Sequence, residues 1–128
     1  MPFENIWEAR GVYIRFSDVV TCGEVQRSNE ALYRDPRFFS SMDYQIADFL
    51  ACSSILAEPD EVRLIAKLDA EMSRHKPGVR VAVVTTMKVI YGYSRMYQLC
   101  SEQSLWETEI FDNLHAARAW ISQTSPPA

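Results

Sequence analysis

The sequence predicts a single α/β domain built on a mixed, mostly parallel sheet, and three observations lead to this fold class. The chain has 128 residues, of which 48% are hydrophobic and 23% charged, as in one globular domain. Apolar side chains alternate at period two in some segments and recur at helical spacing in others. Residues 79–85 form a nearly unbroken β-branched segment, which is typical of a strand covered on both faces in a parallel sheet.

The N-terminal part predicts a hairpin followed by a helix. Two strand-like runs between residues 6 and 16 flank a turn that contains glycine, and the second run alternates apolar with polar side chains. Thr21 stands at the N-cap position of the helix, and Glu24 three residues later completes a capping box. We expect the helix to end at about Arg34, because the Asp35-Pro36 step does not continue a helix.

The middle of the chain predicts a short strand and a well-defined helix. We expect a loop at 36–42, a strand at 44–50 and a second loop of small residues at 51–57. Pro59 then fits the first turn of a helix with an acidic start and the basic end Arg74-His75-Lys76, so both ends complement the helix dipole. Its apolar face is expected to consist of Ile65, Leu68 and Met72, flanked by Val62 and Leu64.

The C-terminal part predicts a strand, a helix, a further strand and a closing helix. The segment 79–85 is the expected central strand, and a helix follows at about Lys88–Ser101. Residues 106–111 are expected to form the last strand, and Asp112 or Asn113 caps the closing helix.

The predicted order of elements is therefore ββαβαβαβα, a single sandwich. The first strand pairs antiparallel at an edge of the sheet, and right-handed crossovers divide the helices between its two faces. We expect one domain over residues 1–122 and a disordered tail over 123–128.

Composition and motifs argue against several classes of function. Thirteen Lys and Arg against 17 Asp and Glu leave a net charge of -4, which favours neither nucleic acid nor an anionic membrane surface. The common phosphate-binding, zinc and serine-hydrolase motifs do not occur, so we expect no enzyme, no metal site and no cofactor. His75, His115, Asp43 and Asp48 are expected to have structural roles.

The sequence also predicts the compartment. The start of the chain lacks the features of a signal peptide, and no apolar run approaches the roughly 18 residues of a membrane span. The three cysteines form no CxxC pair, which fits a reducing environment. We therefore expect a cytoplasmic protein.

Five stretches of the chain carry a family resemblance: 11–16, 44–49, the acidic start of the helix at Pro59, 81–84 and 111–121. With the predicted order of elements, they resemble the STAS superfamily, whose members include bacterial anti-sigma-factor antagonists. The chain is most similar to the SpoIIAA-like branch, which is grouped structurally with the CRAL-TRIO lipid-binding domains. The resemblance implies a STAS-like sandwich and a regulatory role.

The resemblance also implies a candidate phosphoacceptor. In phospho-regulated STAS proteins, the loop after the corresponding strand holds an Asp-Ser or Asp-Thr step followed closely by Gly. The matching hydroxyls here are Ser53 and Ser54. Cys52 precedes them and no glycine occurs before Pro59, so the chain departs from the family pattern.

A second candidate site follows from the topology, because ligands of open α/β sheets bind beyond the carboxyl ends of parallel strands. Three loops are expected to meet there and to form a rim for an anion or another ligand. The alternative is that their hydroxyls only cap helices. The residues are Asp18, Thr21 and Cys22 after the second strand, Cys52, Ser53 and Ser54 after the third, and Thr85, Thr86, Met87 and Lys88 after the central strand.

The helix at about 88–101 is rich in aromatic residues. Tyr91, Tyr93, Met96 and Tyr97 supply more apolar area than one buried face requires, and they are candidates for an apolar interface or pocket. Ordinary packing against the sheet is the alternative. These observations leave two functions open.

The first is a non-enzymatic STAS-like regulatory or interaction module that contacts another protein or a second copy in a homodimer. The second is a carrier or sensor of a small apolar or acidic ligand, bound between the aromatic helix and the sheet. A cavity of roughly 300 Å³ or more favours the carrier, and a filled core with an exposed apolar patch favours the module.

Overall fold

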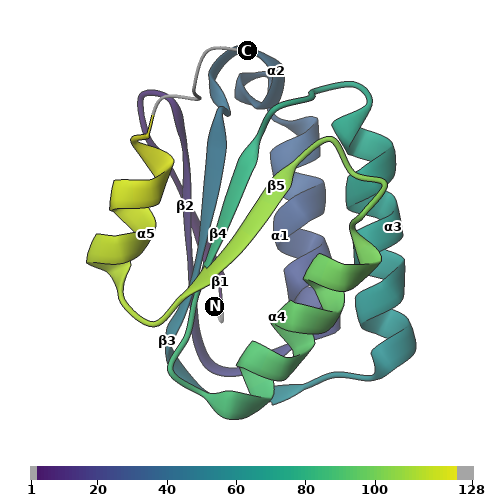
Figure 1. The fold of residues 1–128 in the computed structure, drawn as a ribbon, viewed down its shortest axis with the longest axis vertical. Helices are drawn as coiled ribbons and strands as arrows, with labels where there is room; N and C mark the ends of the chain where they lie inside the picture. Colours follow the sequence, from purple (N-terminus) through teal and green to yellow (C-terminus); the bar gives the residue numbers. More distant parts are fainter. Residues whose placement is uncertain (1–2, 124–128) are drawn as a thin grey trace.

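The computed structural model describes residues 3–123, which form a five-stranded sheet with helices on both faces (Figure 1). The strands are β1 (Phe3–Trp7), β2 (Gly11–Thr21), β3 (Tyr44–Leu56), β4 (Arg80–Val84) and β5 (Glu107–Phe111). The helices are α1 (Cys22–Arg34), α2 (Arg37–Ser41), α3 (Pro59–Ser73), α4 (Lys88–Cys100) and α5 (Leu114–Ile121). The predicted α/β class is confirmed. Of the tail predicted at 123–128, residues 124–128 lie outside the described residues.

The sheet has the strand order β1-β2-β3-β4-β5, with β1 antiparallel to β2 and all other pairs parallel. Each new strand is added on the same side of the preceding one. Right-handed crossovers then place α1, α3 and α4 on one face of the sheet. Figure 1 shows these three helices together on that face and α5 alone on the other.

The β-branched segment forms an interior strand, as predicted. β4 pairs with β3 on one side and β5 on the other, and Val81, Ala82, Val83 and Val84 are all buried. The middle position of the five-stranded sheet belongs to β3 instead.

The predicted loop at 51–57 is wrong, because β3 continues to Leu56. Its second half pairs in parallel with the end of β2, with register shifts on either side of the Ser17–Asp18 pairs. Asp18 has a positive φ of 58°, which marks the irregularity. The small polar side chains at 52–54 do not form an apolar strand pattern. Their backbone is held in the sheet by β2.

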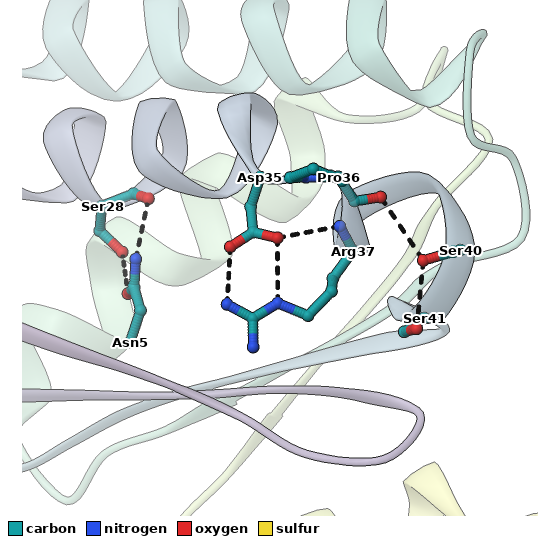
Figure 2. A network of polar contacts seen from close by, with 7 residues as sticks. All are labelled: Asn5, Ser28, Asp35, Pro36, Arg37, Ser40 and Ser41. Atoms are coloured by element: carbon teal, nitrogen blue, oxygen red, sulfur yellow. Dashed lines mark hydrogen bonds and ion pairs between the residues drawn. The ribbon is translucent and has the colours of Figure 1, made fainter.

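The predicted loop at 36–42 is also wrong in part, since it contains helix α2. Figure 2 shows how the chain turns there: Asp35 accepts hydrogen bonds from the backbone N–H of Arg37 at 2.9 Å and from its guanidinium. The guanidinium bond lowers the pKa of the Asp35 carboxyl to about 2. Phe38 is fully buried and packs against Tyr33 and Trp106, so this helix closes one end of the core.

The same view shows how α1 is attached to the edge strand β1. The Asn5 side chain donates to the Ser28 carbonyl at 3.2 Å, and the Ser28 hydroxyl donates to the Asn5 side-chain oxygen at 2.7 Å (Figure 2). Ser28 is fully buried, and this reciprocal pair satisfies its polar atoms.

The opposite face of the sheet is held by α5. Asn113 caps this helix by accepting from the backbone N–H of Ala116, as one of the predicted caps. Arg118 forms a bidentate ion pair with Glu8, with both N–O distances at 2.8 Å, and Tyr44 donates to the same carboxylate. The Arg118 hydrogen bond lowers the pKa of Glu8.

We expect Gly11→Ala to destabilise the protein by about 1–3 kcal/mol, the usual cost of overpacking. A Cβ at position 11 would lie 2.5 Å from ring carbons of Tyr44. Urea unfolding measures the change. The matched control is Gly92→Ala in the exposed part of α4, where a Cβ meets nothing within 4 Å. That control gains about 0.5–1 kcal/mol from helix propensity. Equal effects of both substitutions would contradict the steric argument.

Candidate functional site

The strongest candidate for a functional site is a cavity between the sheet and the helices α1, α3 and α4. This main cavity has a volume of about 110 Å³, and its walls come from all three helices and from β2, β3 and β4. Most of its lining is apolar, and the stacked rings of Phe16 and Phe49, with centroids 4.5 Å apart, form part of the wall on the sheet side. The polar side chains that line it are Asn29, Gln45, Asp69, Tyr93, Ser94 and Tyr97.

Asp69 on α3 is the polar centre of this cavity. It is 6% exposed, and its carboxylate accepts hydrogen bonds from three side chains on the neighbouring helices. Tyr33 of α1 and Asn29 of α1 donate to Oδ1, the latter at 3.4 Å, and Tyr97 of α4 donates to Oδ2 at 2.7 Å. One carboxylate therefore joins the three helices of this layer.

The ionisation of this cluster is shifted by burial. Removal from water raises the pKa of Asp69 to about 6, although the hydrogen bonds from Tyr33 and Tyr97 oppose the shift. Burial, together with the nearby Asp69 charge, raises the pKa of both tyrosine hydroxyls. The two phenols therefore stay protonated donors at neutral pH, where Asp69 is mostly ionised.

Sequence reasoning missed Asp69, because the apolar pattern of α3 predicts a different buried face. The sequence predicts Leu64 and Leu68 on that face, but they are 47% and 38% exposed. Val62 and Ile65 are buried as predicted, and Asp69 lies four residues after Ile65 on the same side. The two tyrosines that donate to Asp69 are 36 and 28 residues away in the chain, so no local pattern indicates them.

The parallel strands that carry the predicted rim end at different positions along the sheet. β4 ends at Val84, which pairs with Asp48, whereas β3 continues eight residues further to Leu56. The β2–β3 pairing is irregular over this stretch, and the end of β3 lies beside α4, where the Tyr93 hydroxyl donates to the Ala57 carbonyl at 2.9 Å. Among residues 3–123, no hydrogen bond joins the segment 85–88 to the predicted rim residues of β2 and β3.

The individual rim residues have local roles. Thr21 caps α1 by accepting from Glu24 N–H at 3.2 Å, as predicted, and Thr85 accepts from Met87 N–H at 3.1 Å. Cys22 is buried and lines the main cavity, and burial raises its pKa to about 11. The other rim residues are Asp18 in β2, Thr86 exposed after β4, Met87 at the N-cap of α4 and Lys88 exposed at its start.

The candidate phosphoacceptors lie within β3 instead of in a loop. Ser53 is exposed and Ser54 is half-buried, while Cys52, also in β3, is buried. Burial raises the pKa of the Cys52 thiol to about 11, so it is not a reactive thiolate at neutral pH. Neither serine is at a helix N-terminus, which is where the family resemblance implies the phosphoacceptor.

The aromatic residues of α4 separate into two groups. Tyr93 and Tyr97 line the main cavity, and Tyr93 donates to the Ala57 carbonyl at 2.9 Å. Met96 packs with the buried Cys22, Val62 and Ile65. Tyr91 is 50% exposed on the outer face of the helix.

Outside the cavity, the acids Asp43 and Asp48 have structural contacts, and His75 and His115 are exposed. Asp43 forms an ion pair with Arg10 at 2.6 Å. Asp48 accepts from the backbone N–H of Leu50 at 2.8 Å and from the Tyr13 hydroxyl.

Within residues 3–123, no group of three or more His, Cys, Asp or Glu side chains is arranged to hold a metal ion. None of the helices in this range combines the length and hydropathy that crossing a membrane requires.

Neither a protein-family model nor a curated protein matches this chain. The resemblance to the STAS superfamily therefore stays a prediction from the sequence.

We expect Asp69→Asn to change how stability depends on pH. The carboxyl has an ordinary pKa of 3.8 and a folded-state pKa of about 6, so between these values the native state binds a proton that the unfolded state has lost. The contribution of Asp69 to the free energy of unfolding is therefore largest below pH 4 and falls as the pH rises towards 6. The total change is on the order of 3 kcal/mol.

Urea unfolding of the wild type and of Asp69→Asn from pH 4 to 8 measures this difference. The two stabilities should converge or cross as the pH rises through this window and run parallel above it. Glu71→Gln, an exposed carboxylate on the same helix, should keep the wild-type profile. Parallel curves for the wild type and Asp69→Asn at all pH values would show that the Asp69 pKa is not raised.

Proposed function

We propose that the protein binds a small, largely apolar ligand between the helix layer and the sheet, as a carrier or sensor. The main cavity is the observation that supports the proposal. Its walls are mostly apolar, and two of its polar lining residues, Asn29 and Tyr97, donate to the Asp69 carboxylate. Ligand sites commonly combine an apolar surface with a small number of placed polar groups.

The volume of the cavity sets the size of the ligand. At about 110 Å³ it does not reach the roughly 300 Å³ of typical drug-sized sites that would favour the carrier on volume alone, so the proposal rests on the lining of the cavity and not on its size. An apolar cavity of about 150 Å³ holds a benzene molecule. The main cavity is smaller than that, so the ligand that fits is more compact than benzene, and not the lipid chain that a CRAL-TRIO relationship implies.

The lining also distinguishes an apolar ligand from an acidic one. No Lys, Arg or His lines the main cavity within the described residues, whereas the Asp69 carboxylate does. An anionic ligand would meet repulsion there and no compensating charge. An apolar ligand is the better supported of the two.

We expect Ala47→Leu to weaken ligand binding, because the larger side chain on β3 would occupy part of the main cavity. Cyclobutanol serves as the probe, and NMR chemical shifts of cavity residues such as Ile14 and Ile90 report its binding. The affinity should fall at least about tenfold, which corresponds to loss of about 1.4 kcal/mol of binding free energy. Ala31→Leu, the same change at an exposed position of α1, should bind as the wild type does.

Two results would contradict the proposal. One is a wild-type spectrum in which cyclobutanol moves no cavity resonance at millimolar concentration. The other is an Ala47→Leu variant that binds the probe as well as the wild type while the free energy of unfolding is unchanged.

We also propose, as a second candidate, that α4 contacts a second copy of the chain in a regulatory module. Tyr91 and Leu99 are 50% and 59% exposed, and Arg95 is exposed between them. Residues spaced by four lie on one face of a helix, so these three side chains form a continuous outward surface. Apolar side chains beside an arginine are typical of protein interfaces.

Sedimentation velocity tests this second function. We expect a monomer–dimer equilibrium in the wild type and a weaker dimer in Leu99→Glu, because a buried unpaired charge opposes association. Leu64→Glu, at an exposed leucine of α3, is the matched control and should not change the equilibrium. A wild type that stays monomeric at all accessible concentrations would rule out this self-contact.

A further inference from the structure

Two cavities in the helix layer adjoin at Asp69. The side cavity, of about 30 Å³, lies between α1 and α3 and shares three lining residues with the main cavity, namely Asn29, Ile65 and Asp69. Its other lining residues include the exposed Glu30 and Leu68. The Asp69 carboxylate therefore stands between an interior apolar space and a depression that reaches exposed residues.

The charge at this junction is negative. Asp69 and Glu30 are the carboxylates that line the two cavities, and within residues 3–123 no Lys, Arg or His lines either of them. Among the described residues, Asp69 Oδ2 accepts one hydrogen bond, from Tyr97. A carboxylate oxygen has two lone pairs, so Oδ2 can accept a further bond from a ligand.

We propose that the ligand is a small primary amine, whose ammonium group binds Asp69 and whose apolar body occupies the main cavity. This inference rests on the proposed function, because the head group matters only if the cavity takes a ligand. An ammonium donates to a carboxylate in a charge-assisted hydrogen bond, which is roughly twice as strong as a neutral one. An amine also compensates a buried carboxylate that has no cationic partner in the lining of either cavity.

The size of the cavity and the position of the charge agree with this class of ligand. The walls from β2, β3 and β4 are apolar apart from Gln45, and the other polar side chains of the lining come from the helices. A ligand with its charge at one end satisfies both. The Tyr33 and Tyr97 hydroxyls already donate to Asp69, so they hold the carboxylate in place and do not neutralise it.

Three probes that share one small ring test the proposal on the intact protein: cyclobutylamine, cyclobutanol and cyclobutanecarboxylate. At about pH 7.5 the amine is cationic, the alcohol neutral and the acid anionic. We expect the amine to bind about tenfold more tightly than the alcohol, and the carboxylate to bind most weakly. Isothermal titration calorimetry and NMR shifts of cavity residues give the three affinities.

Substitutions identify the group that recognises the amine. In Asp69→Asn the amine and the alcohol should bind with equal affinity to within about threefold, because the negative charge is gone. Tyr97→Phe keeps the carboxylate and should keep the preference for the amine. It also keeps the test decisive if Asp69→Asn folds poorly, because loss of the preference in Tyr97→Phe would count against recognition by the carboxylate. Glu71→Gln, exposed on α3, should leave all three affinities unchanged.

The outcomes distinguish failure of the amine proposal from failure of the proposed function. Equal binding of amine and alcohol by the wild type, or a preference for the amine that survives Asp69→Asn, overturns the amine proposal and leaves a cavity that binds apolar ligands. If none of the three probes binds, the proposed function fails together with the inference.

Discussion

The order in which strands are added to the sheet is the constraint on which the rest of the molecule depends. β3, β4 and β5 each join the same growing edge, and right-handed connections then place α1, α3 and α4 on a single face. Three helices must pack side by side over a twisted surface, and their meeting point encloses the main cavity. The cavity is therefore a consequence of the topology, and its chemistry depends on which side chains the three helices direct towards it.

A carboxylate at the position of Asp69 costs folding free energy. A buried carboxylate loses its hydration, and three donors from α1 and α4 are needed to compensate for the loss. An apolar side chain would pack in the same place without this cost, as the neighbouring Ile65 does. Local rules of sequence and structure are most often broken at functional sites, so the conflict between helix pattern and burial at Asp69 directs attention to this cluster.

Much of the fold could be predicted from the sequence, because its signals are local. Thr21 begins α1 as its capping residue, and the β-branched segment at 79–85 is an interior strand. The second half of β3 could not be predicted, since Cys52 and its neighbours form a strand only through pairing with β2. The site could not be predicted either. The aromatic pattern of α4 indicates only that Tyr97 supplies apolar area, whereas its contact with Asp69 joins two helices across 28 residues.

The two faces of the sheet divide the tasks of closing the fold and forming the cavity. On the α5 face, Arg118 pairs with Glu8 across 110 residues of sequence and fixes the C-terminal helix to the β1–β2 hairpin. The core on that side is a separate cluster around Ile46 and Val84, which does not line the main cavity. Substitutions on distant, unconnected sites usually act additively. The face that holds the cavity can therefore change its polar groups while the Arg118–Glu8 pair on the other face keeps α5 attached to the β1–β2 hairpin.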